Sequence, residues 1–476
     1  MYKKNSVILI FPDPKMKGQK ADRPPLGILT VASALIEKDM DVCILDERVE
    51  PDFDTRLSEE LKKGPVCVGI SSMSGRYITS ALRISRLIKQ QSNVPIVWGG
   101  VHPSLEPDST IRHELVDIIV LDDGEETLPK LIEALKDPSA DLRNIHGICF
   151  KRNGQAVMTE PAEPARIENL PLIPFNLVDL NKYNSQEPWT KEKNLLPVET
   201  SRGCPFSCSF CTESMRKKKW RSLSPERVVR DIKEYVKKYS ISSFTFIDDN
   251  FFGDIKRGER IVELLIKEDI GIEWYTNMRP DYMAGASLEF VVRLKKSGCR
   301  MLTFGAESGS PRILKMINKH TTREQIIATN RNLVGSGIFP HFVTIRGFPA
   351  ETPADAAQTL LLNIQLLLEN EKAICDSPFL IVTPGTIIAR QCLQGKAADY
   401  TLEDWAKIFD TEASDIHFPW LSVKTCDFIK RYAMLTNVIH RTNRKDISWL
   451  ENMLFRFILR LSRVILRRGY NALSYT

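Results

Sequence analysis

Three of the ten cysteines lie close together, in the segment Cys204-Pro-Phe-Ser-Cys208-Ser-Phe-Cys211. Thiolates are the usual protein ligands of iron–sulfur clusters, and a cubane cluster normally takes four of them. Cysteines spaced four and three residues apart can wrap a tight loop around three irons, which leaves the fourth iron open for another ligand. The spacing therefore predicts a [4Fe–4S] cluster held by Cys204, Cys208 and Cys211.

A zinc site and chance clustering are the alternatives for this triplet. Zinc would need a fourth Cys or His nearby, but no His lies between His146 and His320 and no Cys between Cys211 and Cys299. The cluster is therefore favoured. The remaining seven cysteines stand singly, mostly among apolar neighbours, and are expected to act as small buried hydrophobic residues. They are Cys43, Cys67, Cys149, Cys299, Cys375, Cys392 and Cys426.

Length and composition set the frame for this site. A chain of 476 residues, 43% hydrophobic and 26% charged, predicts a globular protein of two or three domains. The net charge of +6 is small for this length and does not argue for a nucleic-acid partner. The sequence contains no run of about 18 apolar residues, which a membrane-spanning helix would need. Residues 1–12 lack the features of a signal peptide. We expect a cytoplasmic protein without a disulfide framework.

Residues 1–140 alternate short apolar strands with amphipathic helices. The expected strands are Val7–Phe11, Val42–Asp46, Val66–Ser71, Ile96–Trp98 and Ile118–Leu121. The expected helices are Leu26–Glu37, Phe53–Lys62, Ile78–Gln90 and Leu128–Leu135. Continuous apolar strands between helices are typical of a parallel sheet that is covered on both faces. The fold class predicted here is α/β, with a doubly wound, Rossmann-like or flavodoxin-like domain.

The rest of the chain divides into three further parts. Residues 141–195 hold a predicted hairpin and a Pro-rich stretch, and are expected to form a linker or strap. Strands and helices alternate again over residues 196–400, which predicts a full or partial (β/α) barrel. The six expected barrel strands are Val198–Thr200, Ser243–Asp248, Ile272–Thr276, Met301–Gly305, Phe342–Ile345 and Phe379–Val382. Residues 401–476 are expected to be a helical extension.

The segment from Ser201 to Cys211 resembles the cluster loop that follows the first barrel strand of radical S-adenosylmethionine (SAM) enzymes. The resemblance implies that the open iron binds the amino and carboxylate groups of SAM. Further residues match the family in order along the chain, and each ends a predicted strand, where parallel barrels place their active sites. They imply a SAM site formed by Phe210 beside the adenine, Asp248 and Asp249 near the methionine, Glu307 and Ser308 near the ribose or carboxylate, and Gly347 near the adenine.

The N-terminal domain resembles the cobalamin-binding domain that precedes many radical SAM barrels. The resemblance implies cobalamin contacts at three strand ends, from Ser71, Ser72 and Met73, from Gly99 and Gly100, and from Gly124 and Glu125. Paired glycines permit a close approach of a cofactor to the backbone, although plain domain packing would also use them.

One motif of cobalt-ligating cobalamin domains is missing from this sequence. The D-x-H-x-x-G pattern is not found, and His102 is expected to be a loop residue. We therefore expect cobalamin without a histidine ligand from the protein; the alternative is that cobalamin binding has been lost.

Two basic stretches remain. Arg216–Arg221 is expected to be a solvated loop rather than an RNA-binding patch. Trp449–Arg468 places five arginines on one helical face, opposite an apolar arc. We expect this helix to dock on the barrel, with peripheral membrane contact as the alternative.

The resemblance implies a reaction that begins with reductive cleavage of SAM to a 5′-deoxyadenosyl radical. Family members that methylate then deliver a methyl group from methylcobalamin to the substrate radical. We expect methylation of an unactivated carbon in a secondary metabolite, lipid or tetrapyrrole precursor, with a flavodoxin or ferredoxin-type reductant as partner. The alternatives are a non-methylating tetrapyrrole cyclase and a non-catalytic cobalamin or cluster sensor. A tRNA methylthiotransferase would need a second cysteine triplet upstream, which is absent.

Overall fold

The computed structural model describes residues 5–15, 21–185, 187–191, 194–215, 220–408 and 418–431. The predicted helix Trp449–Arg468 and most of the basic stretch Arg216–Arg221 lie outside the described residues. The chain divides into two compact units. The first unit comprises Met1–Ser201, Met215–Thr245 and Thr383–Asp410, and the second comprises Arg202–Ser214, Phe246–Val382 and Thr411–Thr476.

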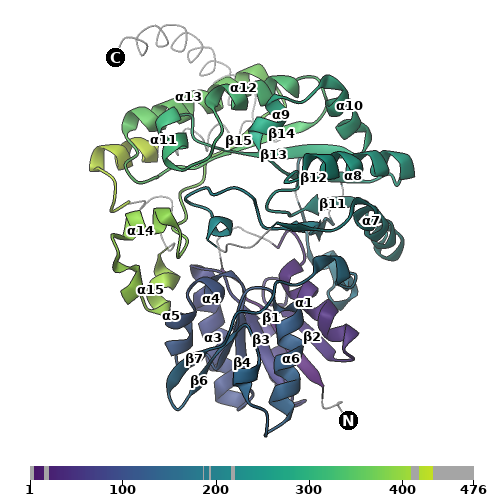
Figure 1. The fold of residues 1–476 in the computed structure, drawn as a ribbon, viewed down its shortest axis with the longest axis vertical. Coiled ribbons are helices and arrows are strands. Elements are labelled where there is room, and N and C mark those ends of the chain that lie inside the picture. The colour runs from purple at the N-terminus through teal and green to yellow at the C-terminus, as the bar shows by residue number, and fades with distance from the viewer. Residues whose placement is uncertain are drawn as a thin grey trace. The chain divides into compact units, whose positions relative to one another are not determined.

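The first unit is built on a seven-stranded sheet with the order β2-β1-β3-β4-β5-β6-β7, which Figure 1 shows with helices on both sides. Its strands are β1 (Ser6–Phe11), β2 (Asp41–Asp46), β3 (Cys67–Ser71), β4 (Ile96–Gly99), β5 (Ile118–Val120), β6 (Ile148–Arg152) and β7 (Gln155–Met158). The pairs formed by β1 to β5 are parallel. The order 2-1-3-4-5 is that of flavodoxin-like folds, whose topological switch point lies between β1 and β3. The predicted doubly wound domain is therefore confirmed.

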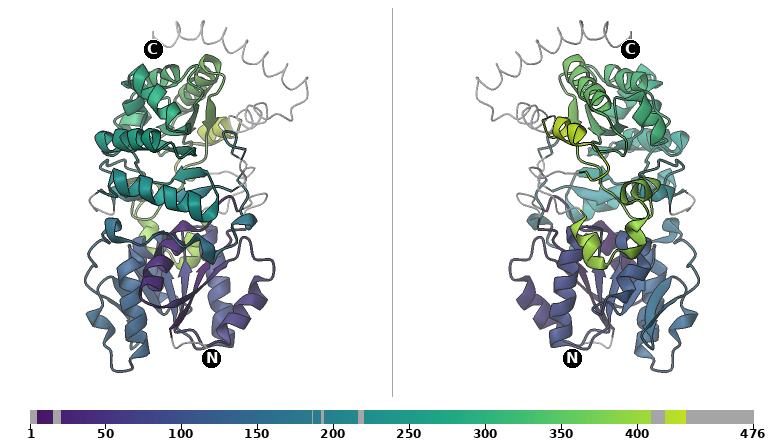
Figure 2. Two further views of the ribbon diagram at one scale, coloured as in Figure 1. Left: turned by 90° about the vertical axis from the view of Figure 1, so that its right-hand side faces the viewer. Right: turned by 90° about the vertical axis from the view of Figure 1, so that its left-hand side faces the viewer.

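Four helices of this unit follow the strands as the sequence predicted: α1 (Leu26–Glu37), α2 (Phe53–Leu61), α3 (Arg76–Gln91) and α6 (Gly124–Lys136). Two short helices, α4 (Val101–Leu105) and α5 (Pro107–Arg112), were not predicted. Three more come from later in the chain: α7 (Pro225–Tyr239), α14 (Ile387–Leu393) and α15 (Leu402–Lys407). Helix α1 packs beside α6, and α2 beside α3; the side views in Figure 2 show helices on either side of the strands. Strands such as β1 are buried along nearly their whole length because both sheet faces are covered.

Two local features of this unit refine the expectation. The predicted hairpin is present as β6 and β7, and β6 pairs antiparallel with β5. It therefore extends the sheet, within the stretch 141–195 that was assigned to a linker or strap. Helix α7 begins as predicted, because the Ser224 side chain caps the Arg227 N–H and Pro225 occupies the first turn. Arg221, at the described end of the basic stretch, donates to the Asp123 carboxylate at 2.7 Å. It is thus part of the fold rather than a free basic side chain.

The second sheet has six strands in the order β15-β14-β13-β12-β11-β8. They are β8 (Leu196–Val198), β11 (Ser243–Phe246), β12 (Glu273–Met278), β13 (Cys299–Glu307), β14 (Phe339–Thr344) and β15 (Ile374–Asp376), and β12 to β15 pair in parallel. The helices of the second unit are α8 (Ile255–Glu268), α9 (Pro280–Ala284), α10 (Leu288–Lys296), α11 (Pro311–Met316), α12 (Arg323–Asn332) and α13 (Pro353–Glu369). A short ribbon of β9 (Ser201–Arg202) and β10 (Arg221–Ser222) completes the strands. This strand–helix alternation is the predicted partial barrel.

The last barrel strand is not where the sequence suggested. We expected it at Phe379–Val382, but the strand is Ile374–Asp376, and Phe379 forms only an isolated bridge with Arg346. Pro378 lies between the two segments, and proline has no N–H to continue a strand ladder. The prediction was wrong because the second apolar run looked more strand-like than the first.

The described residues contain no helix that is both long and apolar enough to cross a membrane.

Candidate functional site

The cysteine triplet lies on the loop Arg202–Ser214 of the second unit. All three thiols are free, with Cys208 buried and Cys204 and Cys211 half-buried. Backbone N–H groups donate toward two of the sulfurs, from Phe206 to Cys204 and from Glu213 to Cys211. Hydrogen bonds to sulfur tune iron–sulfur clusters, so the backbone of this loop suits thiolate ligands.

The three sulfurs lie near one another. Burial, and to a smaller extent the neighbouring Cys208, raises the pKa of the Cys211 thiol to about 11. Burial and the same neighbour also raise the pKa of Cys204. In the described part of the chain, no three Cys, His or carboxylate side chains are grouped to hold one metal ion. The ligands of a cubane each bind a different iron and need not converge on a single point, so the arrangement fits a cluster better than zinc.

Asp249 and Asn250, which follow β11, contact the start of this loop. The Gly203 N–H donates to the Asp249 carboxylate at 2.9 Å, and the Asn250 amide lies 3.9 Å from the Cys204 sulfur. The Asn250 side chain is buried, and its carbonyl oxygen has no hydrogen-bond partner in the structure. Asp249 was predicted as a SAM contact, which stays a prediction; in the structure it holds the start of the cluster loop.

A cavity of about 230 Å³ opens at the carboxyl ends of the barrel strands in the second unit. Parallel barrels place their active sites at this end. Its lining is mostly polar: Asp249, Asn250, Asn277, Met278, Arg279, Thr303, Gly305, Glu307, Lys319 and Val343. Of the six predicted SAM residues, Asp249 and Glu307 line it.

A buried ion pair forms one wall of the cavity. The Lys319 ammonium lies 2.7 Å from the Glu307 carboxylate, and both side chains are less than a tenth exposed. Glu307 has a φ of +56° and sits at an irregularity in the pairing of β13 with β14. Left-handed backbone is costly for a residue with a side chain and marks functional sites in many proteins. Gly305 leaves room for the pair, because a Cβ there would lie 2.4 Å from the Glu307 carboxylate.

The other predicted SAM residues lie away from the cavity lining. Ser308 is buried, and its hydroxyl lies 3.0 Å from that of Thr359, which is a bond within the fold. Gly347 has a φ of +94°, and a Cβ there would lie 2.5 Å from the Phe418 ring. Phe210 meets the ring of Phe348 edge-on at 5.9 Å. Asp248 is buried at the end of β11.

Several residues of the cavity were missed by the sequence analysis. Asn250 directly follows the predicted Asp248-Asp249 pair, and Arg279 directly follows β12, so the strand-end rule could have found both. Lys319 lies in the loop after α11, far from any strand end. No local pattern marks it, because its role depends on a contact with Glu307 twelve residues earlier in the chain.

The predicted cobalamin residues follow β3, β4 and β5 at the carboxyl edge of the first sheet, and β3 borders its switch point. Met73 follows β3 and is 39% exposed, and Val101 follows β4 and is 38% exposed. Between them Gly100 is exposed with a φ of +98°, and a Cβ there would lie 2.9 Å from the Ser72 carbonyl oxygen. Glycine and uncovered apolar side chains at this edge fit a large ring-shaped cofactor approaching the backbone.

The remaining predicted cobalamin residues at this edge differ in their burial and packing. Gly99 and Ser71 are half-buried, and Ser72 is fully buried, with its N–H donating to the Gly99 carbonyl at 2.8 Å. Gly124 opens α6, where a Cβ would lie 3.3 Å from the Val31 side chain, and Glu125 is buried in the same turn.

His102 is not the loop residue that we expected. It belongs to α4 and is completely buried. Its Nδ1 lies 3.0 Å from the Ser74 hydroxyl, and its ring meets Trp405 edge-on at 6.0 Å. Burial lowers the pKa of this imidazole to about 4, so the ring is neutral at pH 7. A side chain enclosed in this way is not presented as a cobalt ligand, which agrees with cobalamin bound without a protein histidine.

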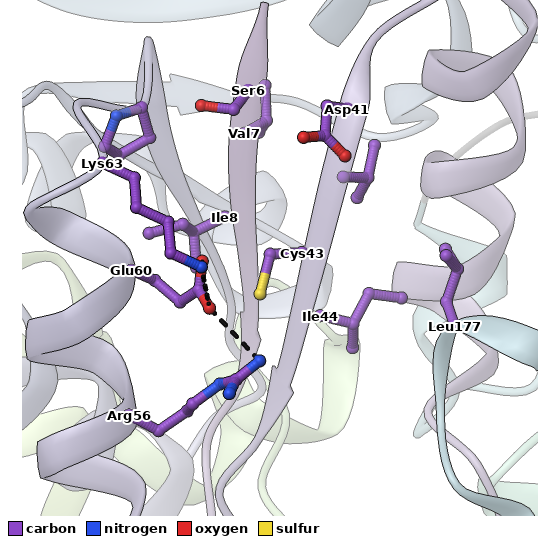
Figure 3. Close-up of a pocket in the computed structure, with 12 residues that line it drawn as sticks. Ser6, Val7, Ile8, Asp41, Cys43, Ile44, Arg56, Glu60, Lys63 and Leu177 are labelled. Atoms are coloured by element: carbon purple, nitrogen blue, oxygen red, sulfur yellow. Dashed lines mark hydrogen bonds and ion pairs between the residues drawn. The ribbon is translucent and has the colours of Figure 1, made fainter. Parts of the chain in front are cut away.

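A second cavity, of about 260 Å³, lies near the amino ends of β1 and β2 (Figure 3). Glu60 is buried there and forms ion pairs with Arg56 and Lys63 at 3.2 and 2.7 Å. Cys43 also lines it, and burial raises the pKa of its thiol to about 11, which keeps it unreactive at neutral pH. This cavity lies at the opposite edge of the sheet from the carboxyl ends of the strands. Such folds bind their ligands at the carboxyl ends. The six other single cysteines are buried as predicted.

Comparison with known proteins agrees with this geometry. Residues 198–362 match the model of the radical SAM superfamily, and residues 19–132 match that of the B12 binding domain. The chain is 30% identical to an uncharacterised methyltransferase of Pyrococcus horikoshii over 370 residues, which are 76% of this chain and 77% of that protein. The chain belongs to the cobalamin-dependent radical SAM methyltransferase family.

Two further proteins are similar to this chain, one in sequence and one in fold. The anaerobic magnesium-protoporphyrin IX monomethyl ester cyclase of Synechocystis is 28% identical over 317 residues, covering 64% of this chain and 62% of the cyclase. The radical SAM methyltransferase TsrM from Kitasatospora setae, solved with cobalamin and a [4Fe-4S] cluster, shares the fold with a TM-score of 0.67. It is 20% identical, and the match covers 84% of this chain and 79% of TsrM.

Membership of the family makes this protein an enzyme that uses a [4Fe–4S] cluster, SAM and cobalamin. The residues described above fit these groups. The three cysteines of the second unit would supply the thiolates, and the charged cavity beside them suits a zwitterion such as the methionine part of SAM. The open, glycine-containing sheet edge of the first unit would take cobalamin.

Proposed function

We propose that this enzyme methylates an unactivated carbon of a small molecule such as a secondary metabolite, a lipid or a tetrapyrrole precursor. The observation that carries the proposal is the charged cavity beside the cysteine triplet, which suits SAM, in a chain that also has a cobalamin-binding edge. The Pyrococcus methyltransferase, which is similar over most of both chains, supports methyl transfer as the reaction. When bound, the cofactors supply radical formation and the methyl group.

The residues of the cavity bind and orient SAM in this proposal. Lys319 would face the carboxylate of the methionine moiety, and Glu307 and Asp249 its ammonium group. Charges enclosed by protein act more strongly than charges in water, and the pair between Glu307 and Lys319 keeps both side chains in place before SAM arrives. Cys204, Cys208 and Cys211 would hold the cluster next to this position.

A row of polar side chains crosses the barrel sheet and supports a substrate with a polar group. Asn277, Thr303 and His341 are neighbours in register on β12, β13 and β14. The Thr303 hydroxyl lies 3.2 Å from His341 Nδ1, and His341 Nε2 lies 2.7 Å from the Asp376 carboxylate. Asn277 and Thr303 also line the cavity. We assign Asn277 and Thr303 to hydrogen bonds with the substrate, because these two polar side chains of the row face the cavity.

The experiment is anaerobic reconstitution of the protein with iron, sulfide and cobalamin, followed by incubation with a reductant, a metabolite library and SAM carrying a trideuterated methyl group. Mass spectrometry should find 5′-deoxyadenosine together with a library compound that has gained the labelled methyl group. Cleavage of SAM without labelled product from any candidate that binds would count against methylation.

The similarity to the anaerobic magnesium-protoporphyrin IX monomethyl ester cyclase of Synechocystis makes oxidative cyclisation the second candidate function. The same incubation separates the two reactions, because cyclisation would consume a tetrapyrrole and yield 5′-deoxyadenosine without transfer of the label. A third outcome, no cleavage of SAM by the reduced and fully loaded protein, would point to a sensor.

A further inference from the structure

The segment 317–321 lies between α11 and Thr322, the N-cap of α12, and it contacts the cluster loop at two points. The Ile317 carbonyl accepts the Ser209 N–H at 2.9 Å. The Asn318 amide donates to both the carbonyl and the hydroxyl of Ser207, each at 2.9 Å. Ser207 and Ser209 are the residues on either side of Cys208. The 317–321 segment therefore holds the central cysteine of the triplet from both sides.

The same segment also forms part of the SAM cavity. Lys319 follows Asn318 directly and forms the buried pair with Glu307. The backbone carbonyl of Lys319 accepts a hydrogen bond from Arg279 at 2.7 Å. The Arg279 guanidinium in turn lies over the ring of Phe206 on the cluster loop, 3.8 Å from its centre. The cluster loop contacts both the 317–321 segment and Arg279, and both of these line the cavity or contact residues that do.

The backbone of the segment is constrained. Asn318 and His320 have φ angles of +56° and +55°, a conformation that Asn adopts at lower cost than most residues. Part of the reason is local, since the N–H groups of Asn318 and Lys319 bond to the last carbonyls of α11 and so end the helix. A helix end does not, however, require the Asn318 side chain to reach residues more than a hundred positions away on the cluster loop.

We propose that Asn318 is a positioning residue: it fixes the Cys208 region for cluster binding and couples the cluster loop to the SAM cavity through Lys319. The inference rests on the cluster and SAM assignments and is independent of which substrate is methylated. Because the segment touches both sites, loosening its contact with the loop should weaken cluster retention and also alter how the cluster responds to SAM.

The test variant is Asn318→Gly. Glycine tolerates the positive φ, so this change removes the two side-chain hydrogen bonds without straining the backbone. The matched control is His320→Gly, which places the same residue in the same conformation two positions later, at an exposed side chain. Asn318→Asp is a second variant, with a similar shape but no donor for the Ser207 carbonyl.

Two readouts do not depend on turnover. The first is the rate at which a chelator removes iron from the reconstituted protein; it should rise roughly tenfold in Asn318→Gly, as the loss of two hydrogen bonds of ordinary strength predicts. The second is the electron paramagnetic resonance spectrum of the reduced cluster, in which the shift produced by SAM should shrink. Asn318→Asp should behave like Asn318→Gly, and His320→Gly like the wild type.

Wild-type iron loss and a wild-type response to SAM in Asn318→Gly would overturn the inference. Equal effects of His320→Gly would also overturn it, because they would show that only the flexibility of the backbone matters. Wild-type protein that binds no iron after reconstitution would overturn the cluster assignment itself, and this inference with it.

Discussion

The carboxyl edges of the parallel strands differ between the two sheets of this enzyme. At the carboxyl edge of the first sheet, polar side chains such as Ser72 and His102 are buried, and Gly100, Met73 and Val101 are left uncovered. At the carboxyl edge of the second, Glu307 and Lys319 form a buried ion pair beside the cysteine loop. The first edge suits a cofactor bound by shape and backbone contact, and the second suits a charged ligand and a cluster. If each edge binds the cofactor that it suits, folds of one general class would bind two cofactors by different physical means.

The largest effect is expected at the cysteines. Replacing Cys204, Cys208 or Cys211 by Ala should remove most bound iron and abolish SAM cleavage, because each thiolate ligates one iron. Cys299→Ala is the control, since this thiol is buried in β13 and should not affect iron content. Iron analysis of the reconstituted proteins measures both. Iron retained by the triple variant would disprove the assignment.

The second largest effect is expected from the ion pair between Glu307 and Lys319. Lys319→Met leaves the buried Glu307 carboxylate without its partner and should destabilise the fold by about 3–5 kcal/mol. Adding Glu307→Gln should restore much of that stability but not the affinity for SAM. Thermal unfolding and equilibrium binding of SAM separate the two effects, with Lys315→Met on exposed α11 as the control. Unchanged SAM affinity in the double variant would remove the pair from the binding site.

The glycines of the first edge should show a smaller effect. Gly100→Ala forces a positive φ on a residue with a Cβ and brings it against the Ser72 carbonyl, which should cost about 1–3 kcal/mol and weaken corrinoid binding. Gly99→Ala has room for its Cβ, so it should fold normally and affect only the binding of cobalamin. Full corrinoid content and normal melting of Gly100→Ala would contradict the assignment of this edge.

The smallest effect is a dependence of stability on pH. Because the pKa of His102 is lowered to about 4 in the folded protein, its contribution is fully present above pH 6.5 and is lost as the pH falls towards 4. At pH 5.5 we expect a loss of about 1 kcal/mol, and His102→Gln should remove this part of the pH dependence. Thermal unfolding between pH 7.5 and 5.5 measures it. A variant with the same acid sensitivity as the wild type would show that other groups are responsible.

The sequence was most informative where local chemistry decides the structure. Helix α7 begins at the predicted cap because Ser224 and Pro225 carry the signal themselves. Strands such as β1 were predicted because their apolar runs are continuous. Strand β15 was misplaced because it is only three residues long and ends in Asp376, which made it less strand-like than the apolar run after Pro378.

The sequence was least informative where a site depends on distant contacts. Lys319 and Asn318 became recognisable only through their partners Glu307 and Ser207. Ser308 illustrates a related limit of the sequence. It fits the family pattern for a SAM contact, which stays a prediction, and the structure adds a hydroxyl contact with Thr359 that the sequence did not indicate. Residue type and order along the chain could locate the site but could not say which way each side chain points.

One measurement tests the contrast between the two edges most directly. Protein loaded with both the cluster and cob(II)alamin is examined by electron paramagnetic resonance with and without SAM. The account predicts a cluster signal that shifts on addition of SAM, because one iron is open. It also predicts a cob(II)alamin signal without nitrogen superhyperfine splitting, because His102 is enclosed by Ser74 and Trp405. A cluster signal insensitive to SAM, or nitrogen splitting on cobalt that His102→Gln removes, would contradict it.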